Sequence, residues 1–133
     1  MLRIPHAIHD DLIAHAREGF PLEVCGILGG LGDSVSAIYR MTNTDASNEH
    51  FMMDPKEQFS VVKDLRSKGL VMLAIYHSHP ETPARPSEED IKLALTPDVS
   101  HIIISLADSA LPVVQSYKIS SGNVTSESIE IGN

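Results

Sequence analysis

The chain has 133 residues, 42% of them hydrophobic, and such a length buries roughly two-thirds of the surface of its unfolded form. We therefore expect a single domain over residues 1–133. Its formal net charge is −8 and its basic residues do not cluster, which argues against nucleic acid as a partner.

The N-terminal third of the chain predicts a helix followed by a strand hairpin. Apolar residues recur at four-residue steps after Pro5, including Leu12 and Ala16, as on one face of an α-helix. Val24–Gly30 is apolar and glycine-rich, which is typical of a buried strand that another segment approaches closely. Ser34–Met41 is the predicted hairpin partner of that strand.

A second helix is predicted to begin at Pro55, a residue that suits the first helical position. Asp54 before it is a suitable N-cap, and Glu57 is placed to complete a capping box. The predicted apolar face of this helix consists of Phe59, Val62 and Leu65.

The second half of the chain predicts more strands than helices. Leu70–Tyr76 is almost wholly apolar, as expected of a central strand covered on both faces, and a short helix follows from Ser87 to about Leu95. The order of elements favours an α+β domain with a mixed sheet. Further strands are predicted at His101–Leu106, Val113–Ile119 and Val124–Ile131.

The sequence shows no membrane-spanning segment or signal peptide, and it contains a single cysteine. The longest apolar runs are too short to span a bilayer, and the N-terminal stretch does not resemble a signal peptide. Cys25 is the only cysteine, which excludes an internal disulfide and a thiolate-rich metal site. We therefore expect a cytoplasmic protein without membrane contact, and Cys25 itself as a buried strand residue.

The most informative motif lies at the end of the central strand. It reads His77-Ser78-His79-Pro80 and, after six residues, Ser87-Glu88-Glu89-Asp90. Because strand side chains alternate, His77 and His79 lie on one face, and Asp90 in the first turn of the next helix can reach the same point. Two nitrogens and one oxygen make a three-ligand zinc site whose fourth position stays open for water, as in catalytic sites. The plain alternatives are two ordinary strand-end histidines and a capping pattern at Ser87-x-x-Asp90.

A zinc-bound hydroxide that attacks a carbonyl needs a proton shuttle and a donor for the developing oxyanion. Glu23 is the only acidic residue between Pro21 and Gly32, at the mouth of a buried strand, and is the best candidate for the base. Ser87 is placed to offer a hydroxyl to the oxyanion. Asn43, Asn48 and Phe51 are candidates for the border of the substrate groove.

These residues resemble the signature of the JAMM (MPN-plus) metalloproteases: an early glutamate, His-x-His-Pro, a short spacer and Ser-x-x-Asp. The resemblance covers nearly the whole chain and implies a curved mixed sheet flanked by helices, similar to zinc deaminases. It also implies that His77, His79 and Asp90 bind one Zn²⁺, that Glu23 is the general base and that Ser87 stabilises the oxyanion.

Members of this family cleave peptide or isopeptide bonds after the C-terminal glycine of ubiquitin or ubiquitin-like proteins. The short chain looks like the compact prokaryotic form, so a sulfur-carrier protein tail is the expected substrate, while a homodimer is left open. The main alternative is a non-catalytic MPN-type scaffold, although such proteins usually lack a ligand and this chain lacks none. A deaminase is disfavoured because the Cys-x-x-Cys pair of zinc deaminases is absent.

Overall fold

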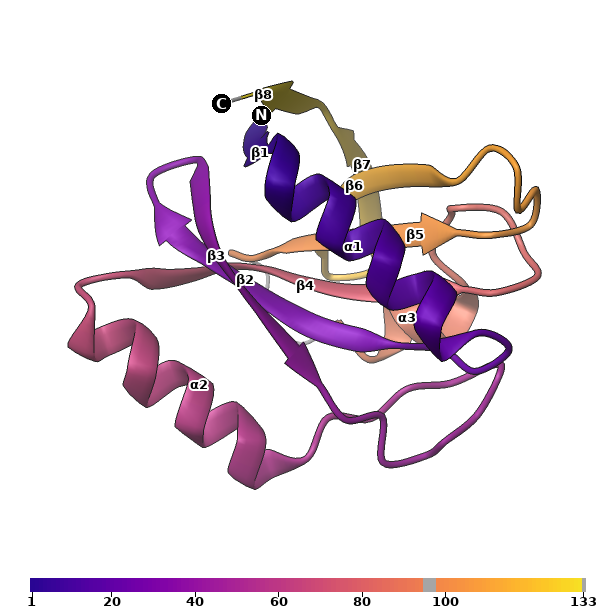
Figure 1. The fold of residues 1–133 in the computed structure, drawn as a ribbon, viewed down its shortest axis with the longest axis horizontal. Helices are drawn as coiled ribbons and strands as arrows, with labels where there is room; N and C mark the ends of the chain where they lie inside the picture. Colours follow the sequence, from indigo (N-terminus) through magenta and orange to yellow (C-terminus); the bar gives the residue numbers. More distant parts are fainter. Residues whose placement is uncertain (95–97, 133) are drawn as a thin grey trace.

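Eight strands form one mixed sheet in the order β7-β6-β5-β4-β2-β3-β1-β8 (Figure 1). The structure is a computed structural model and describes residues 1–94 and 98–132. The strands are β1 (Leu2–Pro5), β2 (Cys25–Leu31), β3 (Ser34–Met41), β4 (Val71–His79), β5 (Ser100–Ser105), β6 (Val113–Ser120), β7 (Asn123–Glu127) and β8 (Ile129–Gly132). The helices are α1 (His6–Gly19), α2 (Pro55–Ser67) and α3 (Glu88–Lys92).

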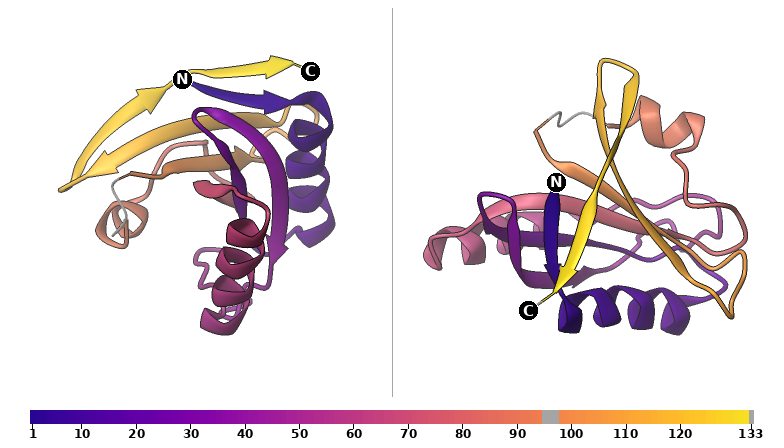
Figure 2. Two further views of the ribbon diagram at one scale, coloured as in Figure 1. Left: turned by 90° about the vertical axis from the view of Figure 1, so that its left-hand side faces the viewer. Right: turned by 90° about the horizontal axis from the view of Figure 1, so that it is seen from above.

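The sheet combines parallel and antiparallel pairs and is strongly curved. Strand β4 runs parallel to β5 and antiparallel to β2, and β1 runs parallel to both β3 and β8. Strands β7 and β8 are at opposite ends of the strand order, yet only Ser128 separates them in the chain. The sheet therefore bends round until its two edges approach, as Figure 2 shows. This arrangement confirms the expected α+β class with a curved mixed sheet.

Helices α1 and α2 pack on opposite faces of the sheet. Leu12 and Ala16 of α1 join the larger core together with Ala74 and Tyr76 of β4. The smaller core lies under α2, and Ile75 of β4 packs against it. From Ala74 onward, alternation along β4 thus sends even-numbered side chains toward α1 and odd-numbered ones toward the opposite face. The two odd-numbered histidines that follow share that opposite face.

Close packing explains a glycine in β2, the predicted buried strand. A Cβ atom added to Gly26 would overlap the ring of Tyr76 on the neighbouring strand β4. The Tyr76 ring is fully buried there, and its hydroxyl forms a 2.6 Å hydrogen bond with His15 Nδ1 of α1. The glycine therefore allows a large side chain to fill the space between sheet and helix.

One strand at the N-terminus was not predicted, and one strand prediction near the C-terminus was wrong. Residues Leu2–Pro5 form β1, a strand that was not predicted because only Leu2 and Ile4 carry its apolar pattern. The single strand predicted over Val124–Ile131 is two strands, β7 and β8, which pair with β6 and β1 respectively. A local pattern does not reveal this division, because β7 and β8 are neighbours in the chain but lie at opposite ends of the strand order.

The face predicted for α2 was also partly wrong. Val61 and Leu65 are the buried residues of this helix, whereas Phe59 is 72% exposed and Val62 is 38% exposed. Asp54 caps the helix as predicted and accepts from Lys56 N at 2.9 Å. The side chain of Glu57 leaves the predicted capping box and instead accepts hydrogen bonds from the backbone N–H and hydroxyl of Thr42, both at 2.8 Å.

Helix α3 is shorter than predicted. It begins at Glu88 after the Ser87 cap and ends at Lys92 rather than near Leu95, a residue outside the described part of the chain. None of the residues of α3 is fully buried. Among residues 1–94 and 98–132, no helix combines the length and apolar character needed to cross a membrane.

Candidate metal centre

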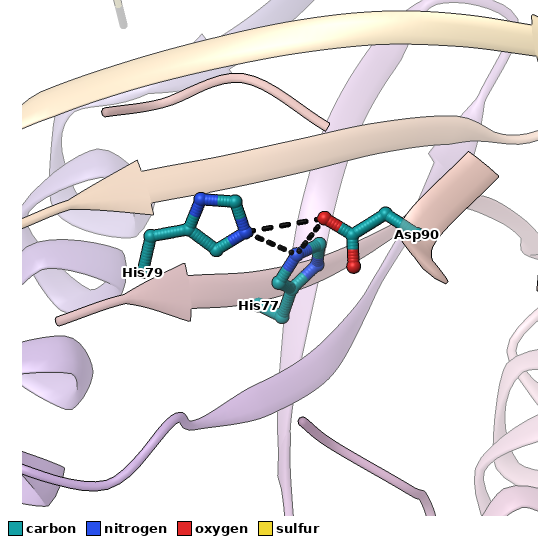
Figure 3. Close-up of side chains that lie close together, drawn as sticks. All are labelled: His77, His79 and Asp90. Atoms are coloured by element: carbon teal, nitrogen blue, oxygen red, sulfur yellow. Dashed lines mark hydrogen bonds and ion pairs between the residues drawn. The ribbon is translucent and has the colours of Figure 1, made fainter. Parts of the chain in front are cut away.

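Three potential ligand atoms converge at the end of β4 (Figure 3). His77 Nε2 and His79 Nε2 are 3.1 Å apart, and Asp90 Oδ2 lies 3.2 Å from the first and 3.1 Å from the second. Both histidines are 4% exposed. The structure therefore brings together the three residues that the sequence nominated, from one strand end and one helix start.

The spacing of these atoms fits a metal ion. A tetrahedral site with bonds of about 2.0–2.2 Å places its ligand atoms roughly 3.3–3.6 Å apart, and the observed triangle is only slightly tighter. Two imidazole nitrogens and one carboxylate oxygen are also one of the donor sets found in catalytic zinc sites. The cluster has the composition and the geometry of a three-ligand metal site.

Neighbouring groups orient two of the candidate ligands, His79 and Asp90. His79 Nδ1 lies 2.9 Å from the carbonyl oxygen of Pro83, so a proton on Nδ1 leaves the Nε2 lone pair directed at the centre of the cluster. The backbone N–H of Ser87 donates to Asp90 Oδ2 at 2.9 Å. The proline-containing loop between the ligands therefore supplies both orienting contacts.

Phe51 packs against the third candidate ligand, His77. The two rings stack with centroids 4.6 Å apart and an interplanar angle of 19°. Asn43, the other predicted border residue with a contact here, donates through Nδ2 to the backbone oxygens of Glu23 and His50, at 3.1 and 2.9 Å. The segment that carries Asn43 and Phe51 therefore contacts the site at both the Glu23 backbone and the His77 ring.

The charges of the cluster favour an ionised Asp90. Burial by itself raises the pKa of Asp90, but the hydrogen bonds from His77 and His79 outweigh it and hold the pKa well below its ordinary value. Burial lowers the pKa of His79, whereas the contacts with Asp90 and Pro83 raise it, and the net shift is upward. The carboxylate is therefore in the state that binds a cation.

The register between β2 and β4 brings Glu23 to the candidate metal centre. In the antiparallel pair of β2 and β4, Cys25 lies opposite His77, and Val24 exchanges hydrogen bonds of 2.8 and 3.0 Å with Ser78. Continuing this register puts Glu23 opposite His79, on the face that the two histidines share. No pattern within residues 21–32 indicates this pairing, because it depends on how β2 and β4 align.

The carboxyl group of Glu23 is buried and short of hydrogen-bond donors. The residue is 5% exposed, and within the described chain its Oε1 atom has no hydrogen-bond partner. Burial raises the pKa of Glu23 to about 7, while the charge of His79 lowers it and that of Asp90 raises it again. A carboxyl group with such a pKa can gain or lose a proton near neutral pH.

Ser87 caps α3 as its sequence pattern predicts. Its hydroxyl oxygen accepts from Asp90 N at 3.0 Å, which together with the Ser87 N–H contact forms a reciprocal capping box. Asp90, a candidate ligand, is therefore held through its backbone and its side chain. The hydroxyl proton of Ser87 is not used in this motif.

One hydrogen-bond contact beside the site was not predicted from the sequence. His50 Nδ1 lies 2.7 Å from Glu89 Oε2, which joins the segment before α2 to the first turn of α3. His50 was set aside because it has no partner at ligand spacing along the chain, and its partner is 39 residues away. Only the folded chain reveals such a contact.

Comparison with known proteins identifies the family. The family model described as prokaryotic homologs of the JAB domain matches residues 5–120. The CysO-cysteine peptidase of Mycobacterium tuberculosis is 36% identical over 122 residues, covering 90% of this chain and 84% of that protein. The desampylase of Haloferax volcanii is 36% identical over 103 residues, covering 72% and 74% of the two chains.

Solved structures agree with this assignment. A protein from Desulfitobacterium hafniense is 46% identical, with a TM-score of 0.91 over 100% of this chain and 94% of that one. A JAB1/MPN domain protein from Archaeoglobus fulgidus, 20% identical, shares the fold with a TM-score of 0.67 over 99% and 100% of the chains. The expected JAMM/MPN fold and the expected metallopeptidase class are both confirmed. The chain belongs to the prokaryotic homologues of the JAB domain, the compact prokaryotic branch of the JAMM metallopeptidases.

Proposed function

We propose that this chain is a zinc-dependent hydrolase that cleaves peptide or isopeptide bonds after the C-terminal glycine of ubiquitin-like proteins of the sulfur-carrier type. The observation that carries the proposal is the triangle of His77, His79 and Asp90 beside the buried Glu23 carboxyl group. The names of the relatives support the substrate class: a CysO-cysteine peptidase, a desampylase and, in Thermus thermophilus, a probable TtuB-protein conjugate cleaving protease.

His77, His79 and Asp90 would hold one zinc ion per chain. Their donor set suits zinc, and the contacts of Pro83 and Ser87 keep two of the three ligands in the binding orientation. When bound, zinc supplies a Lewis acid that polarises the scissile carbonyl and makes water acidic enough to ionise near neutral pH. The roles of the remaining residues follow from their surroundings.

Glu23 would act as the general base and then as the general acid. Its buried carboxylate takes a proton from the attacking water and passes it to the leaving amine, which departs as the carbon–nitrogen bond breaks. The pKa of about 7 suits both steps, because the group exchanges protons readily near neutral pH. Its Oε1 atom, which has no hydrogen-bond partner among the described residues, is free to accept that proton.

Ser87 would donate a hydrogen bond to the oxyanion that forms on the scissile carbonyl. Its hydroxyl oxygen already accepts from Asp90 N, so the hydroxyl proton is available to a second partner. Catalysis and capping are compatible at this residue because they use different parts of the hydroxyl group.

A non-catalytic scaffold is the alternative, and the complete set of ligands together with Glu23 argues against it. The action of residues 1–133 as one catalytic domain, the cytoplasmic location and a homodimer remain predictions. Metal analysis of the purified protein tests the zinc assignment, and we expect about one zinc per chain.

The activity is tested with a carrier protein whose terminal glycine is joined to a reporter peptide. We expect zinc-loaded protein to release a carrier fragment that ends in that glycine, as read by mass spectrometry, and a chelator to stop the reaction. A fusion with valine in place of the glycine serves as the matched control and should be cleaved far more slowly. Equal inertness of the zinc-loaded protein toward every fusion would favour the scaffold.

A further inference from the structure

An apolar pocket of about 350 Å³ lies beside the candidate metal centre. Its floor comes from the odd-numbered face of the sheet, and its rim from α3 and the segment before α2. This size falls within the range of pockets that bind small ligands. Its apolar lining includes Phe51, Met52, Ile75, Leu93, Ile103 and Ile119.

The pocket is continuous with the metal centre. His77 and Asp90, two of the three candidate ligands, form part of its wall. Phe51, which stacks on the His77 ring, belongs to the same wall. A substrate bond held at the cluster therefore lies at the mouth of the pocket, within reach of the side chain of an adjacent residue.

The proposed substrate limits which side chain can enter. Glycine has no side chain, so the residue before the scissile bond cannot fill the pocket. In a Gly-Gly tail the residue before that one cannot fill it either. The nearest side chain on that side then starts roughly 7 Å further along an extended chain. The first residue on the amine side follows one Cα–Cα step of about 3.8 Å after the terminal glycine.

The lining of the pocket disfavours an acidic occupant. Glu89 lines the pocket and is not one of the proposed zinc ligands. An aspartate entering the pocket would lose its hydration among apolar side chains and face the Glu89 carboxylate, whereas an aliphatic side chain would bury apolar surface.

We infer that this pocket binds an apolar side chain, such as leucine or methionine, on the first residue of the amine side of the scissile bond. The inference rests on the proposed cleavage after a terminal glycine and adds selectivity for the leaving group. Leu93 is a specificity residue in this account, since it lines the pocket and is 58% exposed, so that its replacement leaves the core intact.

The first test compares carrier fusions that differ only in the residue after the terminal glycine. We expect zinc-loaded protein to cleave the leucine fusion with a kcat/KM roughly ten- to a hundredfold higher than the aspartate fusion. Leu93→Asp should reduce this ratio by about tenfold. Leu31→Asp is the matched control, because Leu31 is 59% exposed and lies at the end of β2, outside the pocket. Equal cleavage of the two fusions, or equal effects of the two variants, overturns the inference.

The same fusions can be varied on the carrier side. A preference that follows the third residue from the carrier end, and not the first residue of the leaving part, would also overturn the inference. Cleavage of none of the fusions by zinc-loaded protein would count against the proposed function, and the pocket would then be judged by binding alone.

Binding is measured on the Glu23→Gln variant with methyl-labelled methionines. Met52 and Met53 line the pocket, whereas Met72 does not and serves as an internal reference. We expect a Gly-Gly-Leu tripeptide amide at millimolar concentration to shift the NMR signals of Met52 and Met53, and Gly-Gly-Asp to leave them unchanged. Identical responses to the two peptides, or shifts in Met72 alone, would contradict the inference whatever the activity.

Discussion

Two largely buried carboxyl groups lie at opposite ends of the central strands, and their surroundings differ. Glu127 of β7 lies near the start of β5, where the hydroxyls of Ser100 and Ser116 donate hydrogen bonds of 2.6 and 2.7 Å to its Oε1. Glu23 lies at the other end, opposite His79, and its Oε1 has no such donor among the described residues. Lys118 adds a positive charge 4.0 Å from Glu127 Oε2.

The pKa values of the two groups move in opposite directions. Burial raises the pKa in both cases, but the two serine hydroxyls and Lys118 more than offset it at Glu127 and leave its pKa below the ordinary value. At Glu23 burial dominates and raises the pKa to about 7. This difference shows that burial alone does not determine the role of a carboxyl group. A carboxylate with donors stabilises the fold, and one without them is available for proton exchange.

The largest effect is expected from Glu23→Gln. Glutamine keeps the shape of the side chain but cannot carry the proton, so kcat/KM should fall by roughly 10²–10⁴-fold. Zinc content should stay near one per chain, because Glu23 is not among the proposed ligands. The matched substitution Glu127→Gln should leave turnover of the folded protein unchanged. Comparable losses of activity in the two variants would remove the functional distinction between the two ends of the sheet.

His79→Ala tests the proposed zinc ligands, which lie at the same end of the central strands as Glu23. Removal of one of three protein ligands should weaken zinc binding by at least about a hundredfold, measured by competition with a chelating dye. Activity should fall in proportion to the zinc that is lost. His101→Ala is a useful comparison, since His101 lines the adjacent pocket but is not a proposed ligand. Zinc affinity that survives His79→Ala would exclude this residue as a ligand.

Glu127→Gln tests the stabilising role at the other end. The charged acceptor becomes neutral, and we expect a loss of about 1–2 kcal/mol in the free energy of unfolding at pH 7, from urea titration with chelator present. Because the folded pKa of Glu127 is lowered, its contribution should be complete above the ordinary glutamate value and decline as the pH falls through the folded value. Under the same conditions Glu23→Gln should cause no loss, because the raised folded pKa of Glu23 makes its carboxyl group cost folding free energy as the pH rises from the ordinary glutamate value to about 7, and this cost persists above that pH.

The smallest effect is the pH profile of turnover. With the pKa of Glu23 at about 7, kcat/KM should rise about tenfold per pH unit below that value, and then level off as the carboxylate forms. Glu127→Gln should show the same profile, which makes it the control. A flat profile between pH 5.5 and 7, measured on folded, zinc-loaded protein, would contradict the assignment of Glu23 as the base.

Local sequence patterns predicted the parts of the site that depend on neighbours in the chain. The two-residue spacing of His77 and His79 on an apolar strand was enough to place both rings on one face, because strand side chains alternate. The spacing from Ser87 to Asp90 predicted the helix start that carries the third donor. The same reasoning failed for α2, where Phe59 and Val62 fit a helical face but Val61 and Leu65 are the buried residues.

The sequence by itself therefore determined the class of fold, through the order of its predicted elements, and the nature of the candidate donors, through short motifs of consecutive residues. Only the tertiary structure decided which segments meet. The register of β2 against β4 places Glu23 opposite His79, and the curvature of the sheet makes β1 a neighbour of β8. The pocket beside the candidate metal centre is likewise lined by residues that are far apart in the chain, from Phe51 to Ile119. Such contacts depend on long-range packing free energy, which no short segment carries alone.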